Sequence, residues 1–235
     1  MVAAFAPRAY HRRMCNLYAN TTTQEAMRHL FMVRPVHDRL GNFAPLTAIY
    51  PRYDAPVVRL DNDGARELVV MHWGFLLPKV SKRTGKPIQP NAVNNARDDK
   101  LANSRFWRAS FERRRCLIPA TAFCEPKGHK PATYHWFTIK GDEPCPPFAF
   151  AGIWRSWSGE YKGEQTELDT FSMVTTTPND LVKPIHPTRM PVILPPERHE
   201  TWLTGSVSEA EDCLAPYPAG NMRVSCGFDH PAEWT

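Results

Sequence analysis

The 235-residue sequence lacks the patterns that mark several common protein classes. Its six cysteines include no C-x-x-C pair, which argues against a zinc ribbon and against a thioredoxin-type redox motif. No apolar run approaches the roughly 18 residues that a membrane-spanning helix needs. Internal repeats and low-complexity linkers are also absent. We therefore expect one folded domain with no bound metal, no cofactor and no membrane partner.

The N-terminal segment lacks the features of an export signal. Residues 1–13 form a short stretch that is basic near its end and has no long apolar core. Proteins that stay in the reducing cytoplasm normally keep their cysteines as thiols. We therefore expect a cytoplasmic protein whose cysteines are free.

The composition of the chain is that of an ordinary globular protein. Hydrophobic residues make up 42% of the sequence and charged residues 23%. The formal net charge of +5 permits a polyanionic partner but does not require one. The basic residues form two clusters, which are Lys79, Lys82, Arg83 and Lys86, and then Arg105, Arg108, Arg113, Arg114 and Arg115. Each cluster alone is as typical of solvated loops as of a nucleic-acid surface.

The 23 prolines are spread along the chain, which favours short strands and irregular connections over long helices. Thr22 and Glu25 have the spacing of a capping box and predict a short helix through Phe31. The turn residues 61–64 predict a hairpin between strands at 57–60 and 67–72. Further candidates are strands at 115–118, 134–139, 148–154, 171–176 and 191–194, and short helices at 196–203 and 208–214. These elements together predict one α+β domain with a strongly curved antiparallel sheet.

Several short motifs carry the residue types of a reactive site. They are Met14-Cys15-Asn16-Leu17-Tyr18, Trp73-Gly74-Phe75, Asn95-Ala96-Arg97, residues 115–120 followed by Glu125, Ala151-Gly152-Ile153-Trp154, and residues 186–194. In this order and spacing they resemble the SRAP family, the SOS-response-associated peptidases, also called abasic-site processing proteins. The resemblance covers Met14 to Cys226. It implies a single SRAP-like domain over residues 15–235, with curved antiparallel sheets that form a barrel-like core and short flanking helices.

Cys15 is the candidate nucleophile. A lone cysteine is most often a small buried hydrophobe, but this one directly follows Met14. We expect residues 1–14 to be a leader or an unused start that the active form lacks. Cys15 would then carry a free α-amine, with a pKa of about 7.7–8.0, beside its thiol. The amine can attack the aldehyde of an abasic deoxyribose to give an imine. The thiol can then close onto the imine carbon as a thiazolidine ring, which is the linkage that the resemblance implies.

The resemblance also implies partners for Cys15. It makes Glu125 an active-site carboxylate that holds or deprotonates the Cys15 amine, and His186 a general acid or base. Without the family, a surface glutamate and a structural histidine are the more common roles for these residue types. Asn95 would orient the lesion or the Cys15 backbone, and Arg97 would contact a DNA phosphate.

Three further residues are candidates for DNA contact. Trp73 and Pro45 would support a base step splayed beside the lesion, although core packing is an equally good role for Trp73. Arg189, close to His186, is a second candidate for a phosphate contact. The chain departs from the family in having Asn16-Leu17 where the family has Gly-Arg, so an arginine that would meet DNA is missing.

The resemblance leaves more than one activity open. The leading prediction is a monomeric enzyme that crosslinks to abasic sites in single-stranded DNA, is nucleoid-associated when bound, works beside replication-fork proteins and has a lyase activity. A thiol autopeptidase that cleaves before Cys15 is the first alternative, and self-cleavage could also serve as maturation. A noncatalytic single-stranded DNA binding module, in which Cys15 has no role, is the second.

Overall fold

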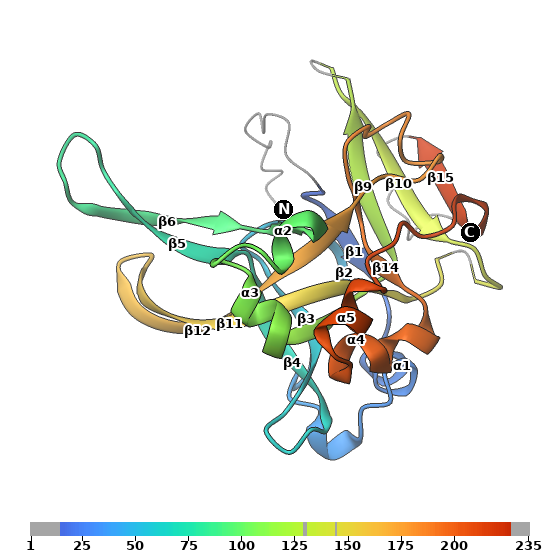
Figure 1. The fold of residues 1–235 in the computed structure, drawn as a ribbon, viewed down its shortest axis with the longest axis horizontal. Helices are drawn as coiled ribbons and strands as arrows, with labels where there is room; N and C mark the ends of the chain where they lie inside the picture. Colours follow the sequence, from blue (N-terminus) through green and yellow to red (C-terminus); the bar gives the residue numbers. More distant parts are fainter. Residues whose placement is uncertain (1–14, 129–130, 144, 227–235) are drawn as a thin grey trace, which may run out of the picture.

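The computed structural model describes residues 15–128, 131–143 and 145–226, and a closed barrel of five strands lies at its centre (Figure 1). The barrel consists of β3 (Asp54–Leu60), β4 (Arg66–Trp73), β8 (Arg115–Ala120), β11 (Phe148–Tyr161) and β12 (Glu164–Thr176). The strands pair in the order β12-β4-β3-β8-β11, and β11 pairs again with β12, which closes the ring. The predicted mixed fold with a barrel-like core is therefore confirmed.

A second, five-stranded sheet lies against the barrel. It contains β15 (Met222–Cys226), β10 (Thr133–Ile139), β9 (Ala122–Lys127), β1 (Tyr18–Asn20) and β2 (Leu46–Ile49), in that order. All its pairings are antiparallel. Strands β8 and β9 follow one another in the chain, so the main chain passes directly from the barrel into this sheet.

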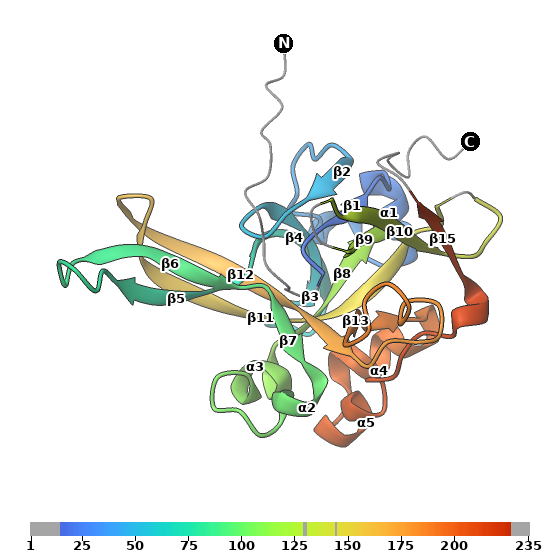
Figure 2. The same cartoon turned by 90° about the horizontal axis from the view of Figure 1, so that it is seen from above.

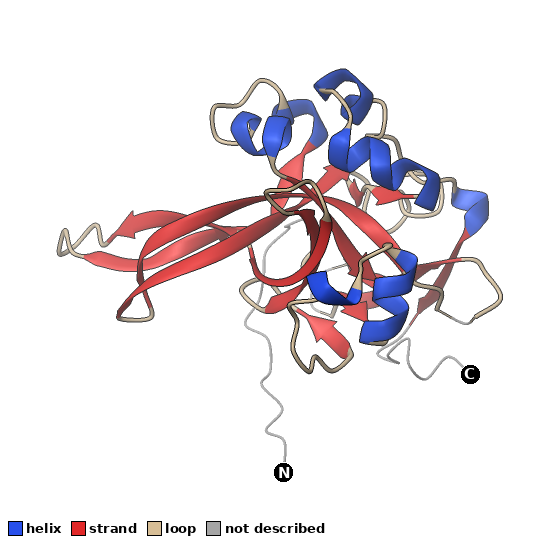
Figure 3. Cartoon of the chain, turned by 90° about the horizontal axis from the view of Figure 1, so that it is seen from below, coloured by secondary structure: helices blue, strands red, loops and turns tan. Residues whose placement is uncertain are grey.

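Short helices and strands complete the described part of the chain (Figures 2 and 3). The helices are α1 (Gln24–Leu30), η1 (Pro35–His37), α2 (Asp98–Leu101), α3 (Arg108–Arg113), η2 (Pro196–Arg198), α4 (His199–Thr204), α5 (Val207–Glu211) and η3 (Ala219–Asn221). The remaining strands are β5 (Phe75–Val80), β6 (Pro87–Val93), β7 (Asn95–Arg97), β13 (Met190–Pro191) and β14 (Ile193–Leu194). No described helix has the length and apolar character needed to cross a lipid bilayer.

The barrel wall separates two apolar clusters. Side chains alternate between the two faces of a strand, so a strand that is buried on both faces feeds both clusters. In β8, which is buried throughout, Ile118 packs inside the barrel with Trp73, while Leu117 packs outward with Phe111 and Trp202 of the helices. The inner cluster also contains Cys15, so the barrel interior reaches the candidate nucleophile.

Most of the predicted strands are confirmed, and so is the first hairpin. The strands predicted at 115–118, 134–139, 148–154 and 171–176 lie within β8, β10, β11 and β12. In the turn between β3 and β4, the Asp61 carboxylate accepts hydrogen bonds from the backbone amides of Asp63 and Ala65. The pairing of β12 with β4 and β7 is parallel, however, whereas the sequence predicted antiparallel pairing.

Several predicted boundaries are wrong. The cap of α1 is Thr23, whose side chain accepts from the Ala26 amide, so the capping box at Thr22 does not form. The strand predicted at 191–194 is split into β13 and β14, which pair with different barrel strands. The helix predicted at 208–214 ends three residues early, at Glu211, and the one at 196–203 begins with a 3₁₀ turn. The predicted leader, residues 1–14, lies outside the described residues.

Gly152 should be required for closure of the barrel. It pairs with Cys116 across β11 and β8, and a Cβ built on it would lie 2.8 Å from Cys116 Sγ and 2.8 Å from Ile118 Cδ1. Gly152→Ala should therefore lower the free energy of unfolding by about 1–3 kcal/mol, measured by urea denaturation. Gly220→Ala is the matched control, because its Cβ would meet nothing within 4 Å. Equal stability of the two variants would contradict the close approach.

Candidate functional site

Cys15 lies at the mouth of the barrel, just before β1. It is 1% exposed, and its thiol points to the backbone carbonyl of Leu17 at 3.6 Å. Its own carbonyl oxygen accepts hydrogen bonds from Asn95 Nδ2 at 3.0 Å and from Asn94 Nδ2 at 3.4 Å. The Asn94 amide also donates to Asn16 Oδ1 at 2.8 Å. Two adjacent asparagines therefore fix the backbone at the candidate nucleophile.

The barrel in turn holds these two asparagines. Strand β7 runs parallel to β12, with Asn95 beside Met173. The carbonyl oxygen of Asn94 accepts from the Met173 amide at 3.0 Å and from Trp73 Nε1 at 2.9 Å. The predicted orienting role of Asn95 toward the Cys15 backbone agrees with this geometry. Asn94 was missed, although the sequence places a second amide directly before the motif.

Glu125 lies on β9, the strand that pairs with β1 directly after Cys15. Tyr18 of β1 lies opposite Phe123 of β9, and continuing that register places Glu125 opposite Asn16, one residue from Cys15. Glu125 is 1% exposed, so the alternative role of a surface glutamate does not apply. Neither of its carboxyl oxygens has a partner at full hydrogen-bonding geometry among the described residues.

Burial is the main cause of the pKa shifts of Cys15 and Glu125. Burial raises the pKa of Glu125 well above its ordinary value, and the Cys15 backbone amide and thiol offset only part of that rise. The pKa of the Cys15 thiol is also raised, first by burial and then by the neighbouring Glu125. Tyr18, which no sequence argument selected, adds a fully buried hydroxyl without a partner among the described residues. Burial at this site therefore shifts the Cys15 thiol and the Glu125 carboxyl group toward their neutral forms.

His186 is placed by its own turn and does not contact the nucleophile. Its Nδ1 lies 2.7 Å from the Arg189 carbonyl oxygen, and the Arg189 backbone amide donates to the same nitrogen at 3.3 Å. Within the described chain no hydrogen bond joins His186 to Cys15 or Glu125. Its predicted acid–base role stays a prediction.

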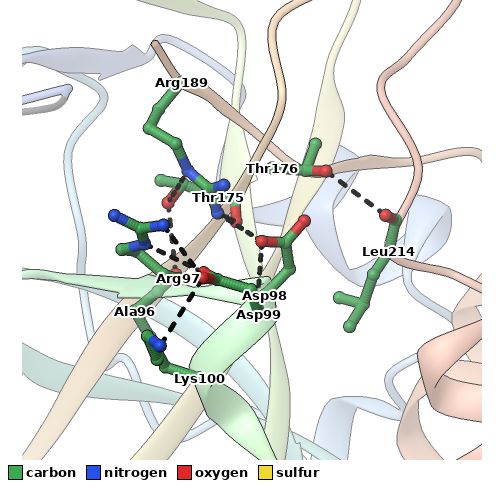
Figure 4. Close-up of polar contacts among 9 residues, drawn as sticks. All are labelled: Ala96, Arg97, Asp98, Asp99, Lys100, Thr175, Thr176, Arg189 and Leu214. Carbon is green, nitrogen blue, oxygen red and sulfur yellow. Dashed lines mark hydrogen bonds and ion pairs between the residues drawn. The ribbon is translucent and has the colours of Figure 1, made fainter.

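Arg189 is an internal structural residue, so its predicted contact with DNA stays a prediction that requires release of its internal partners. The side chain is nearly buried, and its guanidinium donates to Asp98 Oδ1 at 2.5 Å and to the Thr175 carbonyl (Figure 4). These partners leave little of its charge for a phosphate. Arg97, in contrast, is exposed and forms two 2.9 Å hydrogen bonds to Asp99. Its predicted phosphate contact stays a prediction that requires exchange of this ion pair.

Trp73 is part of the core, the alternative role that the sequence left open, and its support of a splayed base stays a prediction. It is 0% exposed, its ring stacks on Phe171 at 6.3 Å and meets Tyr18 edge-on at 5.0 Å. Its indole N–H donates to the Asn94 carbonyl oxygen, so Trp73 contributes to the site by positioning Asn94. Pro45, by contrast, is exposed just before β2, and its DNA contact stays a prediction.

Burial limits the reactivity of the other described cysteines, including Cys124 beside Glu125. The five cysteines with described side chains are free thiols, as expected. Burial raises the pKa of Cys116 beyond its ordinary range and that of Cys124 to about 12, so neither is a competing thiolate. No group of three or more potential metal ligands occurs among the residues that the structure describes.

A family model for the SOS response associated peptidases (SRAP) matches residues 14–226 of this chain. The Abasic site processing protein YoqW of Bacillus subtilis (strain 168) is 33% identical over 195 residues, covering 79% of this chain and 82% of the relative. Abasic site processing protein YobE of the same organism is also 33% identical, covering 79% of this chain and 84% of the relative.

Solved structures share the fold. A crystal structure of a Bordetella bronchiseptica protein superimposes with a TM-score of 0.70 at 25% identity, covering 90% of this chain and 99% of the other. A Bacteroides thetaiotaomicron protein superimposes with a TM-score of 0.69 at 23% identity, covering 90% and 91%. The barrel and its second sheet are therefore a known architecture.

Ionisation of Glu125 should lower the free energy of unfolding. Because burial raises its pKa in the folded protein above the ordinary value of 4.5, the unfolded chain loses this proton first as the pH rises. Wild-type stability should then fall above about pH 4.5 relative to Glu125→Gln, by about 1.4 kcal/mol for each pH unit until the folded pKa is reached. Urea unfolding at a series of pH values measures this difference.

Glu164→Gln is the control for this experiment, because Glu164 is exposed on β12. Its stability difference from the wild type should stay constant over the same pH range. A difference between Glu125→Gln and the wild type that is equally constant would contradict the raised pKa.

Proposed function

Because this chain belongs to the SOS response associated peptidase (SRAP) family, we propose that it processes abasic sites in single-stranded DNA through a covalent bond to Cys15. The names of its Bacillus subtilis relatives support the coarse role, which is processing of DNA that contains abasic sites. The observation that carries the finer role is the fixation of the Cys15 carbonyl by Asn95, beside the buried carboxyl group of Glu125.

The proposed reaction joins two groups of one residue to one carbon of the lesion. The α-amine of Cys15 attacks the aldehyde carbon of the ring-opened sugar, and the resulting carbinolamine loses water to give an imine. The thiol sulfur then bonds to the imine carbon, and the thiol proton moves to the nitrogen. The product is a thiazolidine, and one water is released for each crosslink. No oxidant or other co-reactant is needed.

The surroundings of Cys15 favour attack by the amine first and ring closure by the thiol second. A thiol with a raised pKa is a poor first nucleophile, whereas an α-amine has a pKa near neutrality and attacks readily. A protonated Glu125 can donate a proton to the hydroxyl that leaves from the carbinolamine. His186 can accept the proton that is released when the sugar ring opens. Asn95 positions the amine by holding the adjacent carbonyl.

This chemistry requires that Cys15 be the first residue. An amine that is acylated by residue 14 cannot form an imine, so residues 1–14 must be absent from the reactive protein. The family description as peptidases supports a second candidate, in which the Cys15 thiol attacks the peptide bond before it. The raised thiol pKa weighs against that route, because the thiolate is the attacking species. A binding module without chemistry is the third outcome that the experiments distinguish.

The protein that begins at Cys15 should crosslink to an abasic oligonucleotide and survive denaturing electrophoresis. Cys15→Ala keeps the amine but cannot close the sulfur ring, so its adduct should appear only after borohydride reduction. The chain that retains residues 1–14 should not react unless it is first cleaved. A wild-type-like stable adduct from Cys15→Ala would rule out the thiazolidine, and absence of any adduct would leave the binding module.

Glu125→Gln and His186→Ala should slow crosslinking without weakening DNA binding. Proton transfer by a positioned side chain typically contributes about 10²–10⁴-fold to a rate, and losses in that range are expected in single-turnover assays. His29→Ala is the control, since His29 is exposed on α1 and away from Cys15 in the fold. Wild-type crosslinking rates in both variants would show that neither residue moves the proton.

A further inference from the structure

Strands β5 and β6 form a hairpin that projects beyond the rest of the domain (Figures 1 and 2). We call residues 75–93 the basic arm. Its two strands pair with each other from Phe75 opposite Val93 to Val80 opposite Pro87, and they form a separate two-stranded sheet. The outer part of the arm, residues 78–89, is exposed apart from the half-buried Ser81. Burial of apolar surface therefore does not explain why the arm extends so far.

The charge of the basic arm is of one sign. Residues 75–93 contain four cations, Lys79, Lys82, Arg83 and Lys86, and no aspartate or glutamate. All four are exposed, and none forms an ion pair with any described residue. Unneutralised like charges repel one another, so their gathering on one exposed hairpin favours an anionic partner.

The root of the basic arm is built into the candidate site. Gly74 makes the turn from β4 into β5 with a φ of 119°, and a side chain there would meet Ala92 Cβ at 2.8 Å. At the other end, β6 leads into Asn94 and Asn95, which hold the backbone of Cys15. A strand rises about 3.3 Å per residue, so the six residues of β5 reach roughly 20 Å from that root.

Packing holds the root of the basic arm against the domain. Phe75 is fully buried and packs against Phe106 and Trp107, and Arg155 donates to the Leu76 carbonyl at 3.0 Å. These contacts anchor the root of the arm, and the pairing of β5 with β6 extends its cations away from the domain.

We propose that the basic arm binds the phosphate backbone of duplex DNA that flanks the single-stranded lesion. The inference rests on the proposed function for the identity of the DNA. The arm has no aromatic residue beyond Phe75, so it offers bases no stacking platform, which single-strand binding surfaces normally provide. Cations without aromatics suit the phosphates of stacked, paired strands. A two-stranded ribbon also fits the major groove, which is about 12 Å wide.

The hairpin of β11 and β12 lies beside the basic arm and leaves one face of the arm open to DNA. The turn between β11 and β12 lies across a cavity of about 300 Å³ from the arm, with Glu160 and Lys162 on one side and Ile88 and Gln89 on the other. This hairpin also carries Glu164 and Glu167, whose carboxylates repel phosphates. The DNA should therefore contact the arm on the face away from the cavity. A reach of roughly 20 Å corresponds to about six base pairs.

The test replaces Lys82, Arg83 and Lys86 together by alanine in the full chain. Undamaged DNAs are used, so that the result does not depend on Cys15 chemistry. They are one short single strand and the same strand joined to a duplex of about 12 base pairs on its 5′ or its 3′ side. The matched control is the triple alanine variant of Arg39, Lys140 and Arg198, which removes the same charge from exposed positions elsewhere. Fluorescence anisotropy at several salt concentrations gives the affinities.

The wild type and the control should bind at least one duplex-flanked DNA more tightly than the single strand. The arm variant should lose that advantage, on the order of tenfold, and its salt slope should fall by up to about 2.7. Equal behaviour of the arm variant and the control would overturn the proposal. So would an equal loss on the short single strand, because the arm would then contact unpaired DNA. If the arm effect appears but the protein that begins at Cys15 forms no adduct, the proposed function fails and the arm inference stands.

Discussion

The hydrogen bond from Asn95 to the carbonyl oxygen of Cys15 is the contact on which the geometry of the site depends. It places the backbone of Cys15 at the point where the barrel interior meets the second sheet. Asn95 can hold it because β7 runs alongside β12, and because Asn94 is anchored by the Trp73 indole and the Met173 amide. The barrel therefore positions Cys15 through strand β7, which pairs with β12, and through the buried Trp73, which anchors Asn94.

The energetic cost of the site lies in its buried ionisable groups. A carboxyl group with 1% exposure and no hydrogen-bond partner at full geometry destabilises the folded protein once it ionises. The same burial shifts Glu125 and the Cys15 thiol toward their neutral forms, because it raises the pKa of both groups. Under the proposed function, those protonation states suit attack by an amine followed by closure of a thiol. Stability and reactivity are therefore in opposition at Glu125, as they often are at active sites.

Sequence patterns predicted the local elements of this fold better than its connections. Alternation and turn residues were enough for the β3–β4 hairpin, because Asp61 closes the turn with its own side chain. Nothing local signals that β12 pairs in parallel with β4 and β7, since those pairings join segments about 80 to 100 residues apart. The motif Asn95-Ala96-Arg97 pointed to the right amide, but the role of Asn94 depends on the fold around it. The burial of Trp73 and Arg189 depends on the fold in the same way, because burial cannot be read from residue type.

The most direct test of the account is to locate the DNA adduct by mass spectrometry of peptides from crosslinked protein that begins at Cys15. The account predicts one modified position, Cys15, with one water lost and with neither its amine nor its thiol available to an alkylating reagent. Both groups are then held by the same carbon of the sugar. An adduct on a lysine, or a Cys15 thiol that is still alkylated after crosslinking, would contradict it.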